Sequence, residues 1–108
     1  RGATASSEAA DAVLVVDLRV PHGDSLKAKR SAVTPIVEGA RRRHRVAVAE
    51  VAHQDRLQRS ELAFATVASS ETQAREILDA VERFVWSFPE VEVLHTWRRW
   101  LDDEEDRP

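Results

Sequence analysis

Alternating apolar and polar positions mark the first ordered segment of this chain. Between Ala12 and Val20, every second residue from Leu14 onward is apolar, and Asp17 and Arg19 lie on the other side of the extended backbone. Four valines in this stretch favour a strand. We therefore predict a strand over residues 12–20 with one face toward a core, ended by the turn residues of "PHGD".

The next segment, "LKAKRSAVTPIVEGARRR", repeats its apolar residues at helical spacing from Leu26 onward, and Ser25 before it is a suitable N-cap. Pro35 lies too deep to be a first helical residue, and a proline inside a helix costs about 3 kcal/mol unless the helix bends. We expect either a helix kinked near Ser31, or a short turn followed by a second helical segment that starts at Thr34.

Two further strands are predicted at Arg45 to Ala52 and at Ser60 to Ser69, joined by a loop as in an extended hairpin. A second helix is expected between an N-cap at Ser70 and the stop at Pro89, and a fourth strand at Glu90 to Leu101. This order predicts an α+β fold of the ferredoxin-like βαββαβ type. Its four-stranded, mainly antiparallel sheet would carry two helices on one face, with the first and third strands in the centre.

The chain of 108 residues fits a single domain, which we place at residues 12–101. We interpret residues 1–11 as a disordered extension, or a remnant of processing or cloning, and residues 102–108 as an acidic, self-repelling tail. No apolar run approaches the roughly 20 residues that cross a bilayer. Without a secretory signal pattern, and with no cysteine to report the redox compartment, we expect a cytoplasmic protein.

The second predicted strand, "VAVAEVA" with Arg45 before it, would lie at an edge of the sheet although it is apolar on both faces. Natural edge strands are blunted by charge, proline or a bulge, and here the sequence offers only Arg45 and Glu50. We therefore expect a homodimer, formed through this edge or through the open face of the sheet.

Positive charge is concentrated in one segment, although the net charge of −3 argues against a general nucleic-acid binder. Residues 26–45 hold seven Lys and Arg against Glu38 alone, so they carry +6 and the rest of the chain −9. Lys27 and Lys29 lie near a helix N-terminus, where the helix dipole disfavours cations, whereas Arg41 to Arg43 lie at the favourable end. The functional interpretation is a patch that contacts RNA phosphates, and the structural alternative is a solvated helix face. Base stacking is disfavoured, because the central strands hold only Phe64 as an aromatic residue.

The stretch "AEVAHQDRLQRSEL" is the most polar part of the predicted hairpin. His53 could pair with Asp55 or Glu50 as an acid and base, but Glu50 and His53 are separated by an odd number and would point to opposite faces of a strand. No serine sits in a glycine-flanked elbow, and none of the histidines has a partner at a metal-ligand spacing. We predict no catalytic residue, metal or cofactor, and we retain a polar hairpin and a recognition surface as alternatives.

Three motifs resemble the YlxP-like family of small bacterial proteins, a domain of unknown function: "SLKAKRS", "VAEVAHQDRLQRSELAFATV", and "ILDAVERFV" followed by "PEVEV". The resemblance covers about residues 13–101. It implies a ferredoxin-like fold, no established enzymatic activity, and genes that often neighbour those for ribosome maturation and translation initiation factors. The chain departs from the family at Ala52, where a polar residue is common, at Leu57, where an aromatic is frequent, and in its long N-terminal extension. The family-typical positions would be Ser25, Leu26, Lys27, Lys29, Arg30, Glu50, His53, Gln54, Asp55, Gln58 and Arg59.

These observations favour a non-enzymatic accessory protein that binds ribosomal RNA or a ribosomal particle, such as the small subunit, through the basic helix and the hairpin. One alternative is a dimeric ferredoxin-like module that binds a small ligand or an anionic partner protein. Another is an enzyme that uses His53 and Asp55. The expected contact residues are Lys27, Lys29, Arg30, Arg41, Arg42, Arg43, Glu50, His53, Gln54, Asp55, Gln58 and Arg59.

Overall fold

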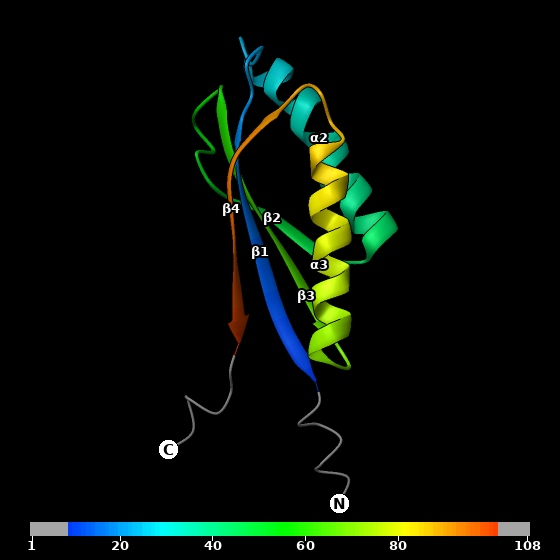
Figure 1. Cartoon of the computed structure of the whole chain (residues 1–108). Helices are drawn as coiled ribbons and strands as arrows, with labels where there is room; N and C mark the ends of the chain where they lie inside the picture. Colours follow the sequence, from blue (N-terminus) through cyan, green and yellow to red (C-terminus); the bar gives the residue numbers. More distant parts are fainter. Residues whose placement is uncertain (1–8, 102–108) are drawn as a thin grey trace, which may run out of the picture.

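A computed structural model describes residues 9–101, and its elements follow the predicted order (Figure 1). The predictions for residues 1–8 and 102–108 lie outside this range. The first strand begins two residues inside the predicted extension. The elements are β1 (Ala10–Arg19), α2 (Leu26–His44), β2 (Ala47–Ala52), β3 (Arg59–Ala68), α3 (Glu71–Trp86) and β4 (Glu92–Leu101).

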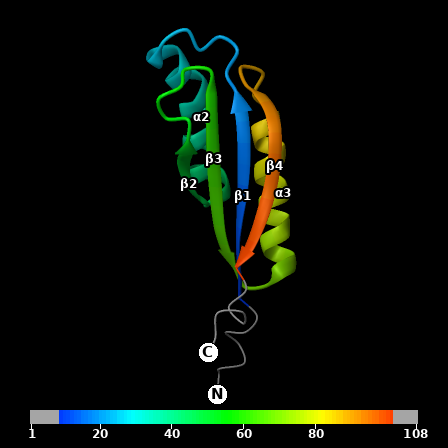
Figure 2. The ribbon, with the colours of Figure 1, turned by 90° about the vertical axis from the view of Figure 1, so that its left-hand side faces the viewer.

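The four strands form one antiparallel sheet in the order β2-β3-β1-β4, so β1 and β3 are central as predicted. Both helices lie on one side of this sheet (Figure 1), and Figure 2 shows the opposite side, which no described element covers. This is the ferredoxin-like βαββαβ fold predicted from the sequence. None of the helices within residues 9–101 combines the length and apolar character needed to cross a membrane.

The core lies between the sheet and the helices, and strand alternation fills it. Leu14, Val16 and Leu18 of β1 are fully buried on the helix side. On β3, Phe64 pairs with Leu14 and Leu62 pairs with Val16. Because the side-chain period of a strand is two, the residues between them face the open side of the sheet. The predicted core face of the first strand is therefore confirmed.

Helix α2 is one uninterrupted helix from Leu26 to His44, so the predicted break before Thr34 is wrong. Ser25 is its N-cap as expected, because its side chain accepts a hydrogen bond from the backbone N–H of Ala28 at 3.1 Å. Pro35 cannot donate to the carbonyl of Ser31. Both residues are exposed, so water can satisfy that carbonyl without ending the helix.

Gly39 lies where α2 and α3 approach each other. A Cβ at this position would collide with the ring of Phe84 on α3. The same ring makes edge-to-face contacts with His44 and Phe88 at centroid distances of 5.4 Å and 5.0 Å. The glycine weakens the helix locally, but it allows the two helices to pack closely.

The edge strand β2 is better protected than its sequence indicated. The guanidinium of Arg41 donates to the carbonyl of Val48 at 3.0 Å, and the amide of Gln54 donates to the carbonyl of Glu50 at 3.2 Å. The β2–β3 register also shifts between Glu50 and Ala52, as at a bulge. The expectation that only Arg45 and Glu50 blunt this edge is therefore wrong, because side chains from the neighbouring helix and loop bind its carbonyls.

Candidate functional site

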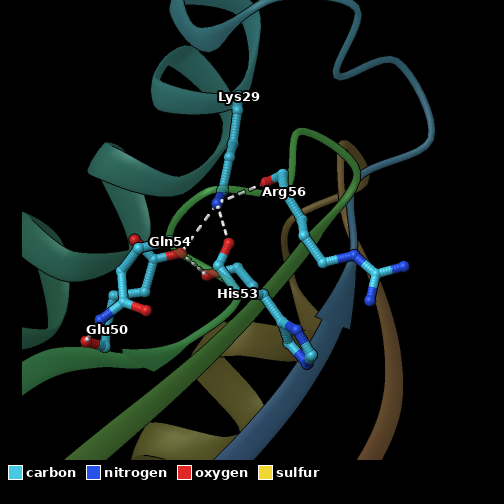
Figure 3. Close-up of polar contacts among 6 residues, drawn as sticks. Lys29, Glu50, His53, Gln54 and Arg56 are labelled. Carbon is cyan, nitrogen blue, oxygen red and sulfur yellow. Dashed lines mark hydrogen bonds and ion pairs between the residues drawn. The ribbon is translucent and has the colours of Figure 1, made fainter.

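Lys29 anchors the loop between β2 and β3, which carries most of the predicted contact residues. Its Nζ donates to the carbonyl oxygens of His53 at 2.8 Å and Arg56 at 2.7 Å, and it forms an ion pair with Oε2 of Glu50 at 2.9 Å (Figure 3). An ammonium group has three N–H donors, and here each has a protein acceptor. The Lys29 side chain is only 4% exposed. Lys29 is therefore not part of an exposed basic surface.

Glu50 completes this anchor from β2. Its Oε2 accepts both from Lys29 and from the hydroxyl of Ser60 at 2.8 Å, and Ser60 is fully buried on β3. The buried ammonium thus has a charged partner, and the carboxylate has two donors, which offsets the cost of removing these groups from water. The position of Lys29 in the unfavourable first turn of α2 is explained by these tertiary contacts.

His53 points its side chain away from this anchor (Figure 3). Its backbone is left-handed, with φ of 66°, and its imidazole points away from Lys29 (Figure 3). The ring lies next to Asp17 of β1 and Glu61 of β3. One ring nitrogen of His53 and one carboxylate oxygen of each acidic residue all lie within 4.8 Å of one another. Asp55, the partner considered from the sequence, is exposed in the loop and does not belong to this cluster.

Glu50 and His53 point to opposite sides of the sheet, as predicted, but strand alternation is not the reason. The bulge places Glu50 opposite Leu62 on the helix side and Ala52 opposite Glu61 on the open side. From Ala52, simple alternation would return His53 to the helix side. The left-handed backbone of His53 instead leaves its ring with the open-side carboxylates.

Arg59 lies on the same open side and binds Asp17. Its Nη2 contacts both carboxylate oxygens of Asp17, at 3.0 Å and 2.8 Å, and its Nε is buried without a hydrogen-bond partner in the described part of the chain. Asp17 and Glu61 were missed as functional candidates. The available signal was the placement of Asp17 on the less apolar side of the first predicted strand.

The remaining basic side chains differ in what they contact. Arg41 binds the edge of β2 and Glu38, and Arg43 lies over the ring of Phe84 at 5.5 Å. A second group is exposed, and its side chains make no hydrogen bond or ion pair within residues 9–101. From α2 to the β2–β3 loop this group consists of Lys27, Arg30, Arg42, Arg45 and Arg56, and elsewhere it includes Arg83 and Arg99.

Two hollows lie beside the anchored loop. A shallow, polar one of about 790 Å³ is lined by Arg19, Arg56, Gln58 and Arg59 around Gly23. A Cβ on Gly23 would collide with the carbonyl of Leu57, so this glycine allows the β1–α2 turn to pack against the loop. A narrower groove of about 370 Å³ runs between α2 and β2. Apolar Val33, Val37 and Val48 line it together with Arg30, Arg41 and Gln54.

The comparison with known sequences identifies the family. The pattern of the family described as "Protein of unknown function (DUF503)" matches residues 12–98. The chain belongs to the DUF503 family. It is also 36% identical over 77 residues to "Uncharacterized protein YlxP" of Bacillus subtilis (strain 168), covering 71% of this chain and 84% of that protein. The YlxP-like resemblance noted in the sequence is therefore confirmed.

Two solved structures resemble the chain at low sequence identity. An acylphosphatase from Coxiella burnetii aligns with a TM-score of 0.47 and 11% identity, covering 93% of this chain and 88% of that one. The intact alpha subunit of aIF2 from Pyrococcus abyssi aligns with a TM-score of 0.43 and 16% identity, covering 81% of this chain and 33% of that one. Likeness at this level says nothing about the activity of a DUF503 protein.

Proposed function

We propose that this DUF503 protein is a cytoplasmic, non-enzymatic accessory protein that binds ribosomal RNA or a ribosomal particle. The observation that carries the proposal is the anchor at Lys29, which joins the two halves of the predicted contact surface. The ammonium on α2 binds the carbonyl of Arg56 in the β2–β3 loop. The exposed side chains of Lys27 and Arg30 on α2 therefore belong to the same end of the molecule as the exposed side chain of Arg56.

The structure sorts the predicted contact residues by what they already bind. Lys29 and Glu50 hold the loop, and Arg41 and Gln54 bind the edge of β2. Free cations supply the sequence-independent part of RNA affinity, because they displace counterions from phosphates. We therefore assign the phosphate contacts to the exposed cations of α2 and the β2–β3 loop whose side chains have no such partner within residues 9–101, namely Lys27, Arg30, Arg42 and Arg56.

Removing two of these cations tests the proposal. We expect a double variant, Arg30→Ala with Arg56→Ala, to bind small ribosomal subunits or their RNA at least tenfold more weakly at low salt. The slope of log affinity against log salt should become shallower by about 2, because each lost phosphate contact changes it by about 1. Co-sedimentation over a salt series measures both quantities. Lys29 is kept, since its replacement would disturb the fold.

The matched control removes two exposed arginines from the other helix, Arg75→Ala with Arg83→Ala. This variant has the same net charge as the test variant but leaves α2 and the loop intact, so its binding should stay within twofold of the parent. Absence of binding by the unchanged protein, or equal weakening by the two variants, would contradict the proposal.

A second candidate rests on the groove between α2 and β2. Valine side chains line it together with Arg30 and Arg41, whose charges favour a small anionic ligand. Glu38 and Glu50 also line the groove, but each forms an ion pair with a basic residue of α2. An organic anion that raises the melting temperature of the protein while ribosomal RNA does not bind would favour this alternative.

We also propose that the protein is a homodimer through the open face of its sheet. The carbonyls of the β2 edge are bound by Arg41 and Gln54, which disfavours pairing through that edge. The open face is apolar in its middle, and at the loop end it carries both signs of charge, so it can be complementary to itself about a two-fold axis. By strand register, the apolar residues on the open face are Val13, Val15, Ala47, Ala49, Ala63, Ala65, Val67, Trp97 and Leu101.

A further inference from the structure

We propose that Asp17, His53 and Glu61 bind a divalent transition-metal ion on the open face of the sheet. This inference goes beyond the proposed RNA binding and does not depend on it. It concerns side chains from three separate segments: Asp17 from β1, His53 from the loop after β2, and Glu61 from β3.

The two carboxylates are held side by side by the sheet. Asp17 and Glu61 are direct cross-strand partners in the β1–β3 pair. Like charges at such positions repel each other, so a cation close by would stabilise the arrangement. Arg59 supplies one positive charge, but its contacts are to Asp17 alone. Glu61 is half-buried, and its carboxylate has no hydrogen bond or ion pair within the described residues 9–101.

His53 brings the third ligand to this pair. Its ring is also half-buried and makes neither a hydrogen bond nor an ion pair to side chains in the described range, although both carboxylates are near. A left-handed backbone is strained for a non-glycine residue, and Lys29 holds the His53 carbonyl in this conformation. The fold therefore keeps an imidazole with a free ring nitrogen beside two carboxylates.

The spacing and chemistry of the three groups match a metal site. The potential ligand atoms lie within 4.8 Å of one another, whereas ligands about 2.1 Å from a tetrahedral zinc ion are roughly 3.5 Å apart. Small rotations of the flexible Glu61 side chain can close this difference. One imidazole with two carboxylates favours zinc and related ions over Mg²⁺ and Ca²⁺, which prefer oxygen ligands alone.

Arg59 is compatible with this site and would orient one of its ligands. A carboxylate has about four acceptor positions, so Asp17 can receive the guanidinium and still offer a lone pair to a metal ion. Hydrogen bonds from residues that do not themselves bind the metal commonly hold metal ligands in place. Three protein ligands would leave a coordination position for water.

Zinc binding to the metal-free full chain tests the inference. We expect isothermal titration calorimetry with ZnCl₂ to show one ion per chain. His53→Asn and Glu61→Gln should each weaken binding at least tenfold. Asparagine is chosen because it tolerates a left-handed backbone while removing the imidazole. Circular dichroism and thermal melting of the metal-free variants establish that they remain folded.

The matched control is His95→Ala, which removes a histidine from β4 that is paired with Asp17 on the same face but lies outside the cluster. It should bind zinc as the parent does. As a second readout, the ring ¹⁵N signals of His53 should shift on zinc addition, while those of His22 and His44 stay in place. No binding, or binding that persists in His53→Asn, would overturn the inference. Because these measurements are made without RNA, neither outcome contradicts the proposed function.

Discussion

Replacing Lys29 with methionine should lower the free energy of unfolding by about 3 kcal/mol, the range seen when one partner of a buried ion pair is removed. The substitution keeps most of the apolar stem but removes the ammonium. Glu50 then loses its charged partner, and the carbonyls of His53 and Arg56 lose their donor. Unpaired buried acceptors and charges carry a full desolvation penalty, so the effect should exceed that of one ordinary hydrogen bond. Urea denaturation followed by circular dichroism measures the change.

Lys27→Met is the matched control, because Lys27 lies two residues earlier on α2 and is exposed. Its effect on the free energy of unfolding should stay within about 0.5 kcal/mol. In the Lys29 variant the β2–β3 loop should also become the first site of limited proteolysis, because its two carbonyls are no longer held. Similar destabilisation by both substitutions would show that the three contacts of Lys29 contribute little.

A lysine at Ala63 should convert the proposed homodimer into a monomer. Ala63 lies in the middle of the open face, between Val15 of β1 and Ala49 of β2. Near a two-fold axis the two new charges would be buried close to each other, which costs several kcal/mol. We expect the dissociation constant to rise at least 100-fold, which corresponds to about 2.7 kcal/mol. Size-exclusion chromatography with light scattering over a concentration series measures it.

Trp86→Lys serves as the control for this substitution. Trp86 is an exposed apolar residue at the end of α3, on the helix side of the molecule, with 61% of its surface accessible. The substitution Trp86→Lys should leave the dimer intact. A parent protein that is a monodisperse monomer at tens of micromolar, or dissociation by Trp86→Lys alone, would argue against the open face as the interface.

The periodicity of the sequence was sufficient for the fold because local and tertiary preferences agree. Ser25 begins α2 where its hydroxyl can cap the helix, and the alternation around Leu14 and Val16 puts a continuous apolar face on the helices. Of the two alternatives predicted for Pro35, the break before Thr34 is wrong. The cost of a proline is a local rule, and at an exposed helix position packing of the opposite, buried side keeps the helix continuous.

The candidate site was less accessible to sequence reasoning. The cluster of basic residues at the start of α2 suggested two neighbouring phosphate contacts, yet Lys27 is exposed and Lys29 is buried. Helical periodicity alone does not show which of the two meets a loop 24 residues away that offers carbonyl oxygens. Sequence proximity favours Asp55 and Glu50 as partners of His53, whereas its spatial neighbours are Asp17 and Glu61.

Patterning along the chain therefore determined the order of elements, the core face of the first strand, the family motifs and the location of the charged segment. These properties depend on periodicity and on neighbours within a few residues. The tertiary structure alone decided the role of Lys29, the protection of the β2 edge and the side of the sheet on which His53 lies. Those features depend on a bulge, a left-handed residue and contacts between distant segments, and none of these has a local sequence period.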